Sequence, residues 1–179
     1  MPQKLKPVRR VVTGHNAAGA SVIEEDGPSP AIKTIDVRPG YAVTNIWRTG
    51  KSPSDVLAED DIIDHHGVMP QQMGTVIRAI DIPPEPMDPE EFQKIMDETF
   101  KQLYPDADHA PSDTRHYGMH KTSTVDYAIV VEGELTAIMD EGETVLKAGD
   151  ILIQRGTNHG WANRSGAICR VVFVLVDGS

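Results

Sequence analysis

The sequence has 179 residues, of which 17 are Lys or Arg and 27 are Asp or Glu, so its formal net charge is −10. Nucleic acids and anionic membranes are bound by clustered cations, and so acidic a chain argues against both partners. The single cysteine excludes an internal disulfide and an all-cysteine metal cage. No apolar run approaches the roughly 20 residues of a membrane span, and the basic start has no apolar segment of a secretory signal behind it. We therefore expect a cytoplasmic protein.

Turn-forming residues divide the first 48 residues into short apolar segments that are typical of β-strands. We expect a polar turn at residues 24–28 and strands near residues 8–12, 20–23, 31–37 and 43–47. The stretch 49–74 predicts a long surface loop with a short helical turn. It contains His65 and His66, which as neighbours in an extended chain face opposite ways and do not easily share one ion. A further strand is predicted at 75–82.

Residues 88–103 predict the one helix of the chain. Asp88 can cap its first turn, Pro89 suits the first helical position, and Glu91 completes a capping box. Apolar side chains recur at helical spacing from Phe92 to Leu103. We expect this amphipathic helix to pack on a sheet, and a lid over a pocket is the alternative.

The second half of the chain returns to a β pattern. Residues 105–119 are polar, and His109 among them is expected to face solvent. From residue 120 onward, apolar runs alternate with turn signals, including a tight hairpin turn at 140–143. The predicted fold class is all-β, an antiparallel barrel to which the first half adds strands and one helix.

Two segments of the second half resemble the motifs of the cupin superfamily. Residues 120–126 with Gly133 are similar to the first motif, His-x-His-x(3–4)-Glu-x(6)-Gly, although Thr122 replaces the second histidine and Asp126 the glutamate. Residues 149–163 are similar to the second motif, Gly-x(5)-Pro-x-Gly-x(2)-His-x(3)-Asn, with Arg155 in place of proline. The resemblance covers residues 112–177 and implies a cupin barrel, the double-stranded β-helix or jelly roll. We expect one domain over residues 1–179, with residues 1–111 as its N-terminal part.

The resemblance places His120, Asp126 and His159 where cupins hold a metal ion. Two imidazoles and one carboxylate are also the donor set of the facial triad that binds non-haem Fe(II) with open positions. One divalent ion is therefore expected as cofactor, with Fe(II) favoured and zinc, manganese or nickel able to use the same donors. The alternative is a metal-free lumen of hydrogen-bonded His, Thr and Asp.

Further residues are candidates for handling substrate. Asp126 and His116 are candidate proton carriers, because His116 lies four residues before His120. Thr122 shares a strand face with His120, and Trp161 shares one with His159, so both can line the pocket. Arg155 and Asn158 precede His159 and could bind an anionic substrate, although an ion pair of Arg155 with Asp150 or a surface carboxylate is an equal alternative.

These features favour a metal-dependent cupin enzyme that acts on a small organic acid or ketone. An oxygenase follows if the metal is Fe(II), and a decarboxylase or dehydratase follows if it is a redox-inert ion. A non-catalytic cupin that binds a small molecule without metal is the alternative, and a purely structural barrel is a third. We also expect a homodimer, because cupins often pair through sheet faces and exchanged N-terminal strands.

Overall fold

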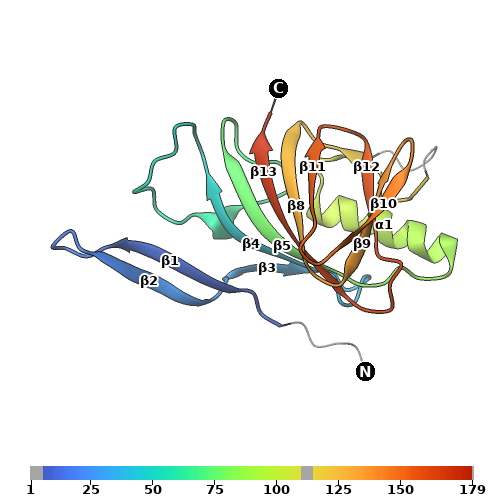
Figure 1. Cartoon of the computed structure of the whole chain (residues 1–179), viewed down its shortest axis with the longest axis horizontal. Coiled ribbons are helices and arrows are strands. Elements are labelled where there is room, and N and C mark those ends of the chain that lie inside the picture. The colour runs from blue at the N-terminus through green and yellow to red at the C-terminus, as the bar shows by residue number, and fades with distance from the viewer. Residues whose placement is uncertain (1–5, 110–114, 179) are drawn as a thin grey trace.

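The fold is built mainly from antiparallel strands, as expected from the sequence. We describe it from a computed structural model, which describes residues 6–109 and 115–178 (Figure 1). The predicted boundary between residues 111 and 112 lies outside these described residues. The strands are β1 (Arg9–His15), β2 (Ser21–Pro28), β3 (Ala31–Thr34), β4 (Ala42–Thr49), β5 (Thr75–Ile82), β6 (Asp108–His109), β7 (His120–Lys121), β8 (Thr124–Glu132), β9 (Glu134–Met139), β10 (Glu143–Lys147), β11 (Ile151–Arg155), β12 (His159–Ala162) and β13 (Cys169–Asp177).

Two sheets pack face to face around a shared apolar core. One sheet has the order β11-β8-β13-β5-β4-β3, and the other has the order β10-β9-β12-β7-β6. Buried side chains of both sheets, such as Val130 on β8 and Leu135 on β9, belong to one core cluster. Strands from the first half of the chain extend the larger sheet, because β5 pairs with β13 along its whole length, from Thr75 opposite Val176 to Ile82 opposite Cys169. The all-β antiparallel barrel with added N-terminal strands is thus confirmed.

The helix α1 (Pro89–Leu103) has the predicted bounds and cap. The Asp88 side chain accepts a hydrogen bond from the Glu91 backbone N–H at 2.8 Å, which satisfies one of the free donors of the first turn. Its buried face is formed by Phe92, Met96, Thr99 and Phe100. Three of these residues, Met96, Thr99 and Phe100, also line an internal cavity. The helix therefore both packs on the barrel and closes a pocket.

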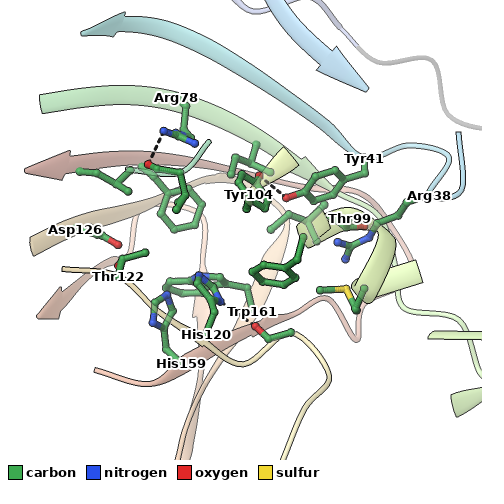
Figure 2. Close-up of a pocket in the computed structure, with 18 residues that line it drawn as sticks. Arg38, Tyr41, Arg78, Thr99, Tyr104, His120, Thr122, Asp126, His159 and Trp161 are labelled. Atoms are coloured by element: carbon green, nitrogen blue, oxygen red, sulfur yellow. Dashed lines mark hydrogen bonds between the residues drawn. The ribbon is translucent and has the colours of Figure 1, made fainter. Parts of the chain in front are cut away.

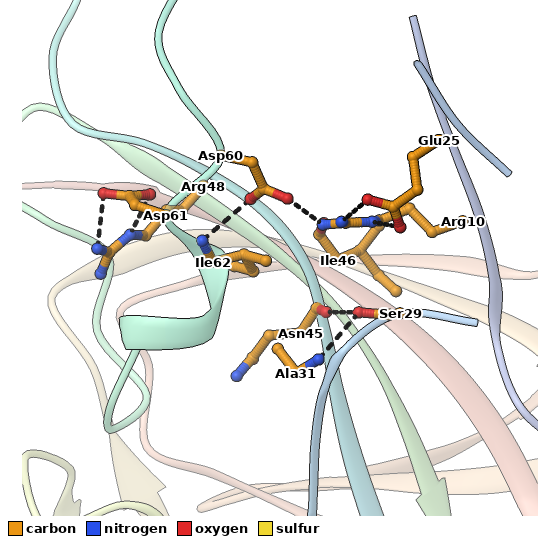
Figure 3. A network of polar contacts seen from close by, with 10 residues as sticks. All are labelled: Arg10, Glu25, Ser29, Ala31, Asn45, Ile46, Arg48, Asp60, Asp61 and Ile62. Carbon is orange, nitrogen blue, oxygen red and sulfur yellow. Dashed lines mark hydrogen bonds and ion pairs between the residues drawn. The ribbon is translucent and has the colours of Figure 1, made fainter. Parts of the chain in front are cut away.

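The N-terminal hairpin differs from the prediction. Residues 24–28 are not a turn, because β2 continues through them and pairs with β1 up to Pro28 opposite Arg9. Ion pairs hold the acidic run in the strand: Arg9 pairs with Asp26 at 2.6 Å, and the buried Arg10 pairs with Glu25 and with Asp60 (Figure 3). Glu25 and Asp26, which resemble part of a solvated turn in the sequence, are thus paired with arginines across the hairpin.

The segment between β4 and β5 is a loop with one short helical turn, as predicted. This turn is the 3-10 helix η1 (Ile62–Asp64), whose Ile62 is buried. The Arg48 guanidinium holds the loop by a two-pronged contact to Asp61, with both distances at 2.7 Å (Figure 3). In the described part of the chain, no helix is long and apolar enough to span a membrane.

Candidate functional site

An internal cavity of about 70 Å³ lies between the two sheets and the helix (Figure 2). Strands β5 and β13 form one wall, β7 and β12 form another, and α1 covers a side. The wall is mostly apolar, with contributions from Ile80, Ile82, Met96, Phe100, Phe173 and Leu175. Among the predicted site residues, those that line the cavity are His120, Thr122, Asp126, His159 and Trp161. Burial among apolar side chains makes this cavity the best candidate for a ligand site in the described structure.

The two histidines of the predicted metal site lie side by side. His120 on β7 is directly opposite His159 on β12, and their ring centroids are 4.3 Å apart. His120 donates its Nδ1–H to the Gly118 carbonyl at 2.9 Å, and His159 Nδ1 lies 2.9 Å from the Thr157 carbonyl oxygen. Because the Gly118 carbonyl can only accept, its bond places the ring proton of His120 on Nδ1 and leaves the Nε2 lone pair available for a ligand. His159 Nδ1 faces both an acceptor, the Thr157 carbonyl, and a donor, Gln154 Nε2, so these contacts orient its ring without fixing which nitrogen carries the proton.

Both imidazoles are neutral around neutral pH. Burial, with the neighbouring His159 next in effect, lowers the pKa of His120 to about 3. Burial also lowers the pKa of His159, against the opposing effect of its bond to Thr157. Metal ions bind the neutral form of histidine, so these two side chains already have the protonation state of ligands.

Asp126 on β8 lines the same cavity without completing a cluster with the histidines. Its side chain is 4% exposed, and its Oδ1 has no hydrogen-bond partner among the described residues. Burial raises its pKa to about 6, with Thr124 and Arg78 opposing the rise. Within residues 6–109 and 115–178, no three His, Cys, Asp or Glu side chains are close enough together to hold a metal ion. The donor types therefore fit a divalent ion, whereas the three predicted ligands are not assembled around one point.

Two predicted substrate-binding residues lie away from the cavity. Arg155 is exposed at the end of β11 and is absent from the cavity wall. The preceding Gln154 is buried instead, and because side chains alternate along a strand, Arg155 points outward. Asn158 donates to Asp140 at 2.7 Å on the protein surface. The ion pair between Arg155 and Asp150 is not formed among the described residues either, since Asp150 accepts from the Lys147 backbone at 2.8 Å.

Three other histidines are placed differently from the expectation. His116, a candidate proton carrier, is buried with its Nε2 2.8 Å from Glu85 Oε1, and it is not part of the cavity wall. His65 was expected in a surface loop but is 2% exposed, because its Nε2 accepts from Arg78 at 3.0 Å. His109 was expected to face solvent, yet its ring stacks on Phe100 at 3.8 Å.

Several residues of the site were missed by the sequence reasoning. Gln154 lies with its Nε2 2.8 Å from His159 Nδ1 and 3.1 Å from the Thr157 carbonyl oxygen, so it fixes the ring of His159. Two arginines, Arg38 and Arg78, also line the cavity. Arg78 could have been found, since residues 76, 78, 80 and 82 share one strand face and are apolar except for this arginine. Arg38 lies in a turn that carries no such signal.

A pair of tyrosines adjoins the two arginines. The Tyr41 and Tyr104 hydroxyls are 2.7 Å apart, and one donates to the other. Burial raises the pKa of both phenols, so both stay neutral. The Arg38 guanidinium lies 4.4 Å from the centre of the Tyr41 ring, in cation–π contact. The cavity thus has a histidine pair in one region and cationic and phenolic groups in another (Figure 2).

Comparisons with known proteins agree with this architecture. The family model for the cupin domain, Cupin_2, matches residues 106–175. The chain is 30% identical over 184 residues to phomopsin biosynthesis cluster protein C' of Diaporthe leptostromiformis, covering 97% of this chain and 80% of that protein. It is 27% identical over 181 residues to the cupin-domain-containing oxidoreductase fogC of Aspergillus ruber, covering 97% and 74%.

Among solved structures, an uncharacterised double-stranded β-helix protein from Klebsiella pneumoniae is 16% identical, with a TM-score of 0.46 over 83% of this chain and 85% of that one. The similarity to the Diaporthe protein extends along nearly the whole of this chain, and the family match includes both motif segments. The chain therefore belongs to the cupin superfamily.

Proposed function

We propose that this cupin is an enzyme that holds one divalent metal ion at His120 and His159 and acts on a small organic acid or ketone in the adjoining cavity. The paired imidazoles carry the proposal, since both are neutral and both direct Nδ1 to a backbone carbonyl. A neutral histidine with a free Nε2, as His120 has, is what a divalent transition metal binds, and His159 offers the same lone pair when its Nδ1–H donates to Thr157. Asp126 is the third ligand, and its buried, unpartnered Oδ1 supports that role.

The reaction class proposed is an oxidation. Relatives such as fogC of Aspergillus ruber and virC of Hypocrea virens are named cupin-domain-containing oxidoreductases. Fe(II) is the favoured ion, and it would supply oxygenase chemistry, whereas a redox-inert zinc, manganese or nickel ion would polarise a carbonyl for decarboxylation or dehydration. The largely apolar wall disfavours water at the reacting centre.

Other residues of this chain would orient the metal ligands or form the wall that contacts the substrate. Gln154 keeps His159 in one orientation through its contacts to the ring and to Thr157. Trp161 packs edge-on against His159 with ring centroids 5.4 Å apart, and it forms part of the substrate wall. Thr122, which replaces a histidine of the motif, contributes a side-chain hydroxyl to the same wall.

Metal analysis of the purified protein tests the proposal. We expect close to one divalent ion per chain in the wild type and a large loss in both His120→Ala and His159→Ala. His15→Ala is the matched control, because His15 is exposed in the N-terminal hairpin and should leave the metal content unchanged. Full metal content in His159→Ala contradicts the site.

A metal-free binding protein is the second candidate. The observation that favours it is the separation of Asp126 from the histidine pair, which leaves no three-ligand cluster among the described residues. In that case the wild type carries no stoichiometric metal after reconstitution with Fe(II), Zn²⁺, Mn²⁺ or Ni²⁺, and binds its ligand with equal affinity in the presence of a chelator.

Two properties of the whole protein complete the proposal. We place it in the cytoplasm and expect it to form a homodimer. The exposed apolar side chains Tyr127, Ile151 and Ile153 on β8 and β11 support a self-association surface, since a monomer rarely leaves such a row uncovered. In this structure β1 pairs with its own neighbour β2, so exchange of this strand between protomers stays a prediction.

A further inference from the structure

Arg38 is a buried cation without a counter-ion. It lies in the turn between β3 and β4 and is 7% exposed. Its guanidinium lines the cavity and stacks on Tyr41. Among residues 6–109 and 115–178, this guanidinium takes part in no hydrogen bond and no ion pair, although it carries five donors.

The other buried arginines of the chain show how unusual this is. Arg10 is 4% exposed and pairs with Glu25 and Asp60. Arg78 is 1% exposed and donates to the carbonyls of Gly67 at 3.1 Å and Val68 at 2.8 Å, as well as to His65. The fold pairs Arg10 with carboxylates and bonds Nη1 and Nη2 of Arg78, whose Nε has no partner among the described residues, whereas no nitrogen of the Arg38 guanidinium is bonded.

No group beside Arg38 supplies the missing negative charge. The phenols Tyr41 and Tyr104 bond to each other and stay neutral because burial raises the pKa of both. Glu85 acts on the Arg38 charge from a distance, but its Oε1 is bonded to His116 at 2.8 Å. Burying an unpaired charge among apolar side chains costs free energy. Pairing with the anionic group of a ligand would therefore stabilise the folded protein.

We propose that Arg38 binds the carboxylate of the ligand, which is a small carboxylic acid with an apolar body. A carboxylate matches the fork of a guanidinium and gives a charge-assisted bond of the stronger kind. The body packs against Ile80, Met96 and Phe173. The far end of the acid faces the histidine pair.

This inference rests on the proposed function only in placing the substrate in the same cavity. It moves the anion site from the exposed Arg155 to Arg38, which is contributed by the N-terminal part of the chain rather than by the motif segments. The net charge of −10 repels anions at long range, so binding of an anionic ligand requires a cation in the cavity itself.

The test compares acids with their neutral amides. Benzoate and hexanoate, with benzamide and hexanamide, are titrated into chelator-treated protein and followed by calorimetry. We expect both acids to bind the wild type about ten-fold or more tightly than the amides, since the amides lose the charge-assisted bond. Arg38→Met should remove this preference and leave the amide affinities unchanged. Arg155→Met is the matched control, because it removes the same charge from an exposed position and should bind like the wild type.

Thermal melting separates a ligand role from a structural one. Arg38→Met should melt at the same temperature as the wild type or higher when no ligand is present, because it removes an unpaired buried charge. The proposal is overturned if neither acid binds the wild type more tightly than its amide, or if Arg38→Met keeps the acid affinities. Because chelator-treated protein is used throughout, a negative result in this binding comparison does not contradict the proposed metal site. A negative metal analysis likewise does not contradict the role of Arg38.

Discussion

Acidification should destabilise this protein through His65. Its Nε2 lies 3.0 Å from Arg78 Nη2, and a guanidinium can only donate, so that ring nitrogen must carry a lone pair. Protonation breaks this bond and places two positive charges together in the interior. Burial, with Arg78 next in effect, accordingly lowers the pKa of His65 to about 4 from its ordinary 6.5.

The sign and the size of the effect follow from linkage. Because the pKa is lower in the folded state, the unfolded chain binds more protons between pH 6.5 and pH 4, so stability falls as the pH falls through this window. Between pH 7 and pH 5, His65 alone should reduce the free energy of unfolding by about 2 kcal/mol. His65→Gln removes the titration and keeps a side-chain oxygen that can accept from Arg78.

Urea unfolding followed by tryptophan fluorescence measures the difference. The quantity compared is the change in unfolding free energy between pH 7 and pH 5, first in the wild type and then in His65→Gln, so that contributions from other groups cancel. His66→Gln is the matched control, since His66 is exposed next to it and should lose as much stability as the wild type. If His65→Gln also loses as much as the wild type, the proposed neutral state of His65 is wrong.

Four further outcomes are expected. Asp88→Ala should lower the free energy of unfolding by about 1 kcal/mol in urea titrations, because it removes the helix cap. Cys169 is fully buried and burial raises its pKa to about 12, so a disulfide reagent at pH 8 should react with it only after unfolding. Gln154→Leu should weaken metal binding about 10–100-fold in competition with a chelator, if it positions His159 as we propose. Light scattering should give the mass of a dimer, with weaker dimerisation after deletion of residues 1–12, and a monomer at tens of micromolar speaks against the assembly.

The secondary structure was predictable wherever local signals decide it. Strand β5 and helix α1 have the predicted ends, since apolar periodicity and the Asp88 cap are encoded within a few residues. The extent of strand β2 was not predictable, because its carboxylates Glu25 and Asp26 pair with Arg10 and Arg9, which lie more than ten residues earlier in the sequence. Turn propensity is a local quantity, and tertiary ion pairs override it here.

The site shows the same division. The place of His120, Asp126 and His159 in the cavity wall was predictable because their spacing matches family motifs, and alternation along a strand places Thr122 and Trp161 in the same wall. Their role as metal ligands stays a prediction. The same alternation turns Gln154 inward and its neighbour Arg155 outward, so Arg155 does not reach the cavity. The burial of His65 depends on Arg78, thirteen positions away, and no pattern in the sequence links the two.

The N-terminal part of the chain is what makes this cavity different from a bare barrel. Strands β7 and β12 supply the histidine pair, whereas β5, the β3–β4 turn and α1 supply Arg78, Arg38 and Phe100. The relative from Diaporthe is similar over 97% of this chain, so the likeness extends well beyond the motif segments. Because the proposed metal site and the proposed anion site come from different parts of the chain, substitutions at Arg38 should change which ligand binds and leave the metal content unchanged. Substitutions at His159 should do the reverse, and a double variant should show both effects independently.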